Sequence, residues 1–183
     1  MEKQTRSISY GPTDIVFEWG HIARQADMAL TTRVGGTVMF TAINVTKEPI
    51  AADFLPLYVD YRENFYSAGR IPGGFFKREA RPNLVETLRA RLIDRPIRPL
   101  LPDGYRRDLQ IVSHLWSFDE ENPAETAAIC GASLALMLSS VPLKKPIAAV
   151  RVGMDESGAF VLNPTLEQMK ASRLDLVVAG AED

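Results

Sequence analysis

Two short segments of this chain combine the kinds of side chain that hold single-stranded nucleic acid. The first, residues 73–82, places Phe75 and Phe76 beside Lys77 and Arg78, directly after two glycines. Aromatic rings stack on bases of any sequence, and neighbouring cations hold the phosphates. This loop therefore predicts a grip on single strands that does not read their sequence. The residues alone leave open an alternative, a hairpin tip with two half-buried phenylalanines and a solvated charge run.

The second segment is a row of arginines. Arg91, Arg95 and Arg98 follow one another at i, i+4 and i+7, close to one helical line, and Arg81 lies shortly before them. Like charges at this spacing destabilise an isolated helix by roughly 0.2–0.5 kcal/mol per pair. Because an anion lying against the row would offset that cost, we expect these four arginines to contact the phosphates of a nucleic acid. The alternative is that their stems cover apolar surface and that they pair with nearby acids, namely Glu86, Asp94 or Asp103.

The charge of the chain is distributed unevenly. Residues 70–107 carry ten Lys and Arg against four acids, a net charge of +6, whereas the remainder carries −8 and the whole chain −2. A positive field on an otherwise acidic body attracts a polyanion to one place.

The remaining composition excludes several classes of protein. Cys130 is the single cysteine, so no internal disulfide exists, and its small apolar neighbours predict a buried thiol in a reducing compartment. His21 and His114 lie far apart without partners at metal-ligand spacing, so we expect no metal site. The sequence shows neither a signal peptide nor an apolar run of membrane-spanning length. We therefore expect a cytoplasmic protein without a membrane partner.

The pattern of elements predicts one α+β domain over residues 1–183. Strands and helices mix without strict alternation, and Gly35–Gly36 marks a hairpin between two strands. Since a sheet normally needs a covering helix beside its last strand, we expect a chain truncated at its C-terminal end. The predicted strands cover residues 14–18, 28–32, 37–45, 55–61, 109–118, 147–152, 160–162 and 174–178.

The first predicted helix carries the arginine row. It begins after Asn83, where Glu86 completes a capping box, and Pro96 is expected to end it. Helical spacing predicts that its apolar residues are buried, namely Leu84, Val85, Leu88 and Leu92.

Two further helices are predicted. One starts at Asn122, with Pro123 as its first helical residue. The other runs over residues 164–171, with Asn163 as its cap. The longer helix carries a thin face that can press closely against a sheet, formed by Ala124, Ala128, Gly131, Ala132 and Ala135.

Residues 70–82 and 86–100 together resemble the first core domain of the bacterial polynucleotide phosphorylase family. The similarity extends to residues 148–153, 162–165 and 174–180 and so covers essentially the whole chain. Ala80 departs from the family, which usually has glycine before Arg-Pro, so we expect a stiffer loop here.

The resemblance implies a ribonuclease PH-like domain of mixed β-sheets packed with helices. In that family two such domains per chain assemble as a trimer into a six-domain ring around an RNA channel. The complete enzyme degrades RNA from its 3′ end by phosphorolysis and releases nucleoside diphosphates. The resemblance thus implies single-stranded RNA as partner, a homotrimer in the full-length form, pairing with a second ribonuclease PH-like domain, and Mg²⁺ bound outside this fragment. It also implies that Phe75, Phe76, Lys77 and Arg78 line the constriction of the channel.

The same resemblance implies that this half is catalytically silent. Active domains of the superfamily place one aspartate six residues before a second, and a Lys or Asn two residues beyond it. The acids suit a divalent metal or general acid chemistry, and the cation stabilises developing negative charge. Here the three positions hold Met169, Asp175 and Val177, so only the second acid remains.

The turn before the second helix points the same way. Active domains tend to bind phosphate there with backbone N–H groups. In this chain Pro123 removes a donor and Glu125 repels an anion. We therefore expect neither a catalytic residue nor a metal in this chain.

Two functions are compatible with these features. The first is the RNA-gripping and assembly half of a phosphorolytic exoribonuclease. The alternative is a stand-alone, non-catalytic RNA-binding or scaffold subunit of an exosome-like ring. An independent small-molecule enzyme has no support, because no serine has an evident His-acid partner.

Overall fold

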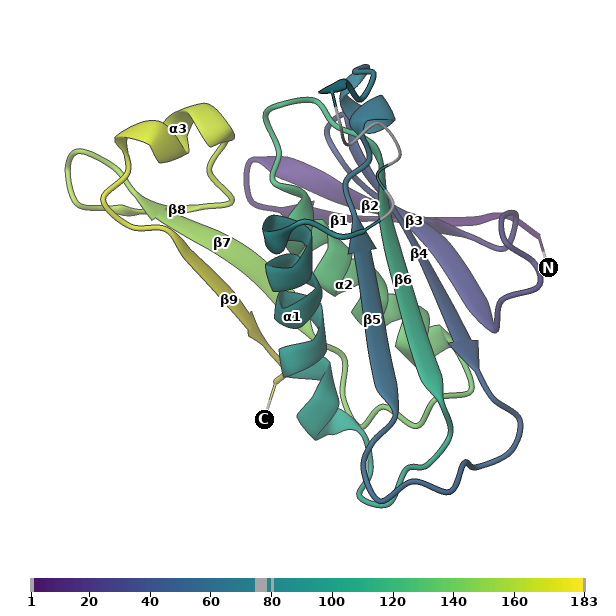
Figure 1. Ribbon diagram of the computed structural model, residues 1–183. Coiled ribbons are helices and arrows are strands. Elements are labelled where there is room, and N and C mark those ends of the chain that lie inside the picture. The colour runs from purple at the N-terminus through teal and green to yellow at the C-terminus, as the bar shows by residue number, and fades with distance from the viewer. Residues whose placement is uncertain (1, 75–78, 80, 183) are drawn as a thin grey trace.

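The computed structural model describes residues 2–74, 79 and 81–182 of the chain. Its largest element is a six-stranded sheet with the strand order β1-β2-β3-β4-β6-β5 (Figure 1). Neighbouring strands are antiparallel except β5 and β6, which are parallel. The strands are β1 (Gln4–Tyr10), β2 (Thr13–Trp19), β3 (Met28–Val34), β4 (Thr37–Val45), β5 (Leu57–Arg62) and β6 (Leu109–Ser117).

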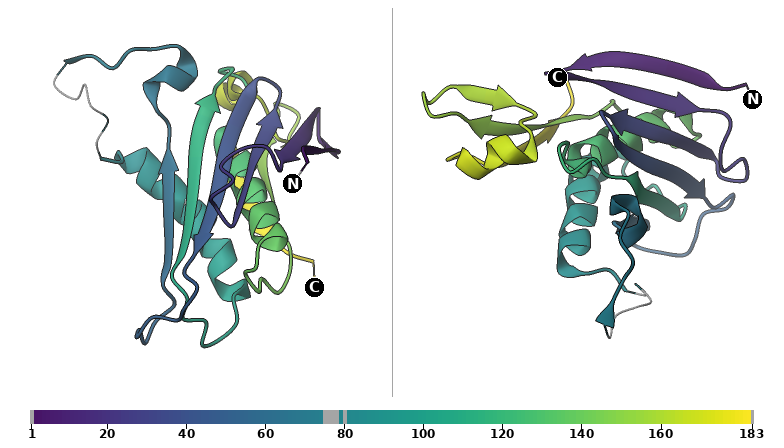
Figure 2. Two further views of the ribbon diagram at one scale, coloured as in Figure 1. Left: turned by 90° about the vertical axis from the view of Figure 1, so that its right-hand side faces the viewer. Right: turned by 90° about the horizontal axis from the view of Figure 1, so that it is seen from above.

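A second, three-stranded sheet follows in the chain. It has the order β8-β7-β9 and is formed by β7 (Ala148–Met154), β8 (Phe160–Leu162) and β9 (Leu176–Gly180). The helix α2 (Ala124–Leu138) lies between the two sheets and contacts β3, β4 and β7 (Figures 1 and 2). Beside it, α1 (Leu84–Ile97) packs against β5, and α3 (Leu166–Ala171) lies next to the small sheet. This arrangement confirms the α+β class.

The helix α2 approaches the large sheet closely because its facing side chains are small. All five residues of the predicted thin face are buried. A Cβ at Gly131 would lie 2.5 Å from Thr32 Oγ1, so the close approach requires glycine at this position. The expectation of a buried thiol is also confirmed, since Cys130 is buried with its Sγ 3.4 Å from the backbone N of Ala149.

The start of α1 is as predicted, but its buried face is not. Asn83 caps the helix, and Glu86 completes the capping box with hydrogen bonds of 2.9 and 2.7 Å. Leu84, Val85 and Leu88 are exposed, contrary to our expectation. The helix has apolar residues on more than one side, and its contact with the sheet selects a different one. The residues that it buries are Glu86, Ile93 and Ile97, and Leu92 packs partly against the core.

The prediction that Pro96 ends α1 is wrong. The helix continues to Ile97, and a 3₁₀ turn, η3 (Arg98–Leu100), follows. Proline removes its own N–H from the helical ladder and crowds the carbonyl four residues earlier, but the N–H of Arg98, two residues on, still bonds Asp94 O. Because Ile93 and Ile97 are almost fully buried on either side of it, their packing holds the last turn in place.

The starts of the other two helices also differ from the predictions. Pro123, rather than Asn122, is the N-cap of α2, and Asn122 instead donates its side-chain amide to Asp119 at 2.6 Å. Thr165, rather than Asn163, caps α3. The Asn163 side chain accepts from Arg151 N and donates to Tyr10 O, so it joins β7 to β1.

The strand β1 has no counterpart among the predicted strands. Its residues are almost all exposed, so no alternation of apolar residues marks it in the sequence. Backbone pairing along the whole of β2 holds it in place. Within the described residues, no helix is long and apolar enough to cross a membrane.

The outer face of the small sheet is apolar and exposed. The cross-strand pairs Val150–Val178, Val152–Leu176 and Met154–Phe160 lie on one face of it. Phe160, Leu162, Leu176 and Val178 are all exposed. Such a face is typical of a surface that packs against another element.

Candidate nucleic-acid interface

The arginine row forms a groove along α1 and η3. Arg91, Arg95 and Arg98 are exposed, and together with Asp94 and Pro99 they line a depression of about 460 Å³. Helical geometry places positions i, i+4 and i+7 on one side, and the continuation of the helix through Pro96 keeps Arg98 in that row. The structure therefore brings three of the predicted arginines to one surface.

Arg98 differs from the other two because its guanidinium is already occupied. It donates to both carboxylate oxygens of Asp94, at 3.0 and 2.6 Å, and to the carbonyls of Leu55 and Leu57, each at 3.3 Å. The hydrogen bonds that Arg98 donates to Asp94 raise the pKa of Arg98 above its ordinary value. Internal ion pairing, the alternative to RNA contact, thus applies to Arg98, which ties η3 to the segment leading into β5.

Arg91 and Arg95 make no such contacts. Within the described part of the chain, neither has a salt bridge or a side-chain hydrogen bond. The groove therefore offers two guanidiniums to an external anion. Arg81 is exposed just before the helix, on the same segment of the chain. Phe75, Phe76, Lys77 and Arg78 lie outside the described residues, so their predicted contact with RNA stays a prediction.

A second arginine, Arg151 on β7, is surrounded by acids. Its Nε and one terminal nitrogen bond the two oxygens of Asp175 at 2.8 and 2.7 Å, and its other terminal nitrogen bonds Glu125 Oε1 at 2.8 Å. Glu125 is buried in the first turn of α2. We call this cluster of Glu125, Arg151 and Asp175 the closed corner.

The ion pairs continue from the closed corner to α1. Arg89 lies 3.6 Å from the second oxygen of Glu125 and also pairs with Glu63 at the end of β5. One buried carboxylate therefore lies between two guanidiniums on different elements. The hydrogen bonds from Arg151 lower the pKa of Asp175 below its ordinary value, so both charges of that pair are maintained at neutral pH.

Sequence reasoning did not assign a role to Arg151. It lies directly across from Val177 in the β7–β9 pairing. One signal was present: Arg151 is the only charged residue of β7, and a charge in an otherwise apolar strand needs a partner. The identity of that partner depends on the fold, because Asp175 and Glu125 come from distant segments.

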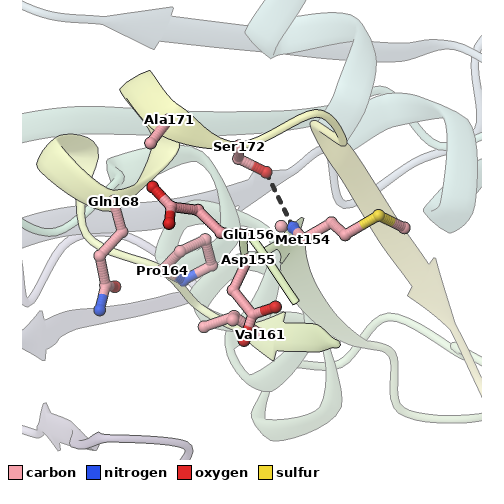
Figure 3. Close-up of a pocket in the computed structure, with 9 residues that line it drawn as sticks. Met154, Asp155, Glu156, Val161, Pro164, Gln168, Ala171 and Ser172 are labelled. Carbon is pink, nitrogen blue, oxygen red and sulfur yellow. Dashed lines mark hydrogen bonds between the residues drawn. The ribbon is translucent and has the colours of Figure 1, made fainter. Parts of the chain in front are cut away.

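The side chain of Met169 lies between α3 and β7, beside both apolar and polar groups. Met169 lies on α3 with its sulfur directed at β7, 3.3 Å from where a Cβ of Gly153 would lie. Beside it, a cavity of about 190 Å³ opens between α3 and the β7–β8 hairpin (Figure 3). Its walls include Val161 and Pro164, and Ser172 Oγ accepts a hydrogen bond from Met154 N at its edge.

The closed corner does not fit a magnesium ion. Mg²⁺ prefers carboxylate and water oxygens in octahedral geometry, but Arg151 occupies both oxygens of Asp175 and one of Glu125. Within the described residues, no three His, Cys, Asp or Glu side chains are grouped as a metal site. The carboxylate oxygens of the closed corner that could bind a metal are thus hydrogen-bonded to Arg151.

Two family models match consecutive parts of the chain. A family model described as "3′ exoribonuclease family, domain 1" matches residues 13–142, and the model for domain 2 of the same family matches residues 145–183. The chain belongs to the 3′ exoribonuclease family. The boundary between the two matches falls between α2 and β7, and our expectation of a single domain over residues 1–183 stays a prediction.

Individual relatives make the placement more specific. The chain is 50% identical over its whole length to a polyribonucleotide nucleotidyltransferase of Protochlamydia amoebophila, and 48% identical to one of Staphylococcus carnosus. It spans about a quarter of their length, 26% in each case. Among solved structures, rice (Oryza sativa) Rrp46 superposes with a TM-score of 0.69 at 13% identity, covering 96% of this chain and 83% of that one. This likeness confirms the ribonuclease PH-like fold.

Proposed function

We propose that this chain is the RNA-binding, catalytically silent half of a phosphorolytic 3′-to-5′ exoribonuclease. Its identity to polyribonucleotide nucleotidyltransferases over the whole chain supports the enzyme class. The observation that carries the silent assignment is the closed corner. Of the three positions that the family resemblance marks, only Asp175 holds an acid, and Arg151 neutralises it. Met169 and Val177 supply neither a second acid nor a cation.

In this proposal the arginine groove holds the RNA backbone. Arg91 and Arg95 point two charges at solvent, and a phosphodiester is the anion that an exoribonuclease presents to such a surface. Arg98 positions the groove by joining it to the chain before β5. Arg81 and the residues of the 75–78 loop would extend the same path.

The rest of the enzyme would supply what this chain lacks. We propose that the full-length protein pairs this domain with a second ribonuclease PH-like domain, which carries the catalytic acids and Mg²⁺, and that it assembles as a homotrimer. The alternative, a stand-alone scaffold subunit, is not favoured by a specific observation, since the relatives that match the whole chain are named as nucleotidyltransferases.

A phosphorolysis assay tests the silent assignment. The chain is incubated with oligo(A), inorganic phosphate and Mg²⁺, and nucleoside diphosphates are quantified against a mock preparation. We expect no release above the mock, whereas a full-length relative serves as the positive control. Release that survives repurification and is abolished by Asp175→Asn would show that this half is catalytic.

A further inference from the structure

A short 3₁₀ turn, η1 (Phe65–Ala68), presents two aromatic side chains to solvent. Phe65 is 46% exposed and Tyr66 55% exposed, and none of the residues in the turn is buried. The turn follows the end of β5, at the top of Figure 1. Single exposed aromatic residues are common on protein surfaces, but two adjacent ones on one turn form a small apolar patch, and contiguous patches are typical of interaction sites.

The turn is held firmly in place. Ser67 O accepts from Phe118 N at 2.9 Å, which ties the turn to the end of β6. The Ser67 hydroxyl donates to Asn64 O at 2.8 Å, and Gly69 closes the turn in the left-handed conformation. Because these hydrogen bonds fix the backbone of residues 64–69, the two rings are attached to an ordered turn. We call this turn the platform.

The same platform is joined to both parts of the predicted RNA path. Phe65 N donates to Glu79 Oε1 at 2.8 Å, and Glu79 comes directly after residues 75–78. Two residues before the turn, Glu63 N donates to Glu86 Oε1 at 2.8 Å in the first turn of α1. The turn therefore lies between the end of the 73–82 segment and the helix that carries the arginine groove.

The chain segment that follows the turn is positively charged, although the carboxylate of Glu79 accepts a hydrogen bond from the turn itself. The turn is followed at once by residues 70–107, which carry the net charge of +6. Arg70 and Arg81 are both exposed there, and the partner of Arg70, Glu120, is equally exposed, so that pair is screened and weak. Exposed aromatic rings next to cations match the chemistry of single-strand binding, in which rings stack on bases and cations hold phosphates.

We propose that Phe65 and Tyr66 form a second site, next to Glu79, at which the bases of single-stranded RNA stack. The proposal rests on the RNA-binding function proposed above and adds to it a pair of residues that contact bases. Stacking uses the face of a ring, which every base has, so this site binds without reading the sequence.

The test compares RNA with and without bases. Phe65→Ala, Tyr66→Ala and the double variant are titrated at low salt with labelled oligo(A) and with an abasic oligomer of the same length. We expect each single change to weaken oligo(A) binding by roughly 5- to 150-fold and to leave abasic binding and the melting temperature unchanged. Tyr66→Phe, which keeps the ring, should bind oligo(A) like the unmodified chain.

A matched control comes from another exposed phenylalanine. Phe54 is 64% exposed and lies in the β4–β5 connection, at the opposite end of β5 from η1 (Figure 1). Phe54→Ala removes a ring of similar exposure without touching the platform. It should leave the affinity for both oligomers unchanged.

The outcomes separate this inference from the function on which it rests. If Arg91→Ala with Arg95→Ala weakens binding while the aromatic variants do not, the stacking site is wrong and the RNA-binding function stands. If neither set weakens binding, the RNA-binding function itself is wrong. Equal losses on oligo(A) and the abasic oligomer would overturn stacking. A change in oligomeric state with normal RNA binding would show that the turn docks protein instead.

Discussion

The groove on α1 and the closed corner use the same side chain in opposite ways. In the groove, Arg91 and Arg95 are exposed and have no acidic partner among the described residues. In the closed corner, Arg151 is bonded to two carboxylates, one of them buried. An arginine surrounded by acids of its own chain stabilises the fold, whereas one without them can bind a ligand. Among the described residues, the position of the counter-charges thus distinguishes a region with two guanidiniums without acidic partners from one in which the guanidinium is neutralised.

The largest effect is expected when the closed corner loses its cation. Arg151→Met would leave Glu125 buried without its close partner, and breaking a buried pair in this way costs about 3–5 kcal/mol. Urea unfolding at neutral pH measures the change. Arg91→Met is the matched control and should change the free energy of unfolding by less than about 0.5 kcal/mol. Equal effects at the two positions would contradict the comparison.

The groove should show the reverse behaviour. Arg91→Ala with Arg95→Ala should lower the slope of log K against log salt for single-stranded RNA by about 1.4, since each phosphate contact contributes about 0.7. The melting temperature should not change. Arg24→Ala with Arg33→Ala, two exposed arginines on the loop before β3 and on β3, removes the same charge elsewhere. A slope that falls equally in both double variants would show only a general effect of net charge.

Arg98 should fall between the two regions. It lines the groove but is bonded to Asp94 and to two carbonyls. Arg98→Ala should therefore lower stability by about 0.2–1 kcal/mol, as expected for a partly exposed pair, and change the salt slope by less than about 0.7. A full slope change without loss of stability would place Arg98 with Arg91 and Arg95.

The smallest effect concerns pH. Hydrogen bonds from Arg151 lower the pKa of Asp175 in the folded chain, so this carboxylate stabilises the fold above its unfolded pKa of about 3.9. That contribution is lost as the pH falls below this value and through the folded pKa. Asp175→Asn should therefore reduce stability near neutral pH, and the difference from the unmodified chain should shrink in acid. Urea midpoints across that range give the comparison, and a difference independent of pH would exclude the linkage.

Local sequence patterns predicted well where neighbours in the chain decide the outcome. The capping box of Asn83 and Glu86 forms as expected, because both partners lie within one turn. The thin face of α2 is buried as expected, since only small side chains allow a helix so close to a sheet. The spacing of Arg91, Arg95 and Arg98 also predicted their common surface.

The patterns failed where distant segments compete. Leu84 and Leu88 have helical spacing but are exposed, because the sheet contacts the side of α1 that carries Ile93 and Ile97. Asn122 and Asn163 are plausible caps, yet Asn122 bonds Asp119 in the turn before the helix, and Asn163 bonds the backbone of β7 and of the distant β1. A cap contributes about 1 kcal/mol, so tertiary hydrogen bonds of similar strength can redirect it.

The amino-acid sequence by itself determined the capping box of Asn83 and Glu86, the positive segment and the absence of the expected residue types at two of the three positions that the family resemblance marks. These depend on residue type and short-range spacing. Only the tertiary structure decided that Arg98 is committed internally, that Arg151 joins Glu125 to Asp175, and that Phe65 and Tyr66 stay exposed beside Glu79. The physical reason is that the strength of a charge or an aromatic face depends on what surrounds it in space, and here those surroundings come from segments far apart in the chain.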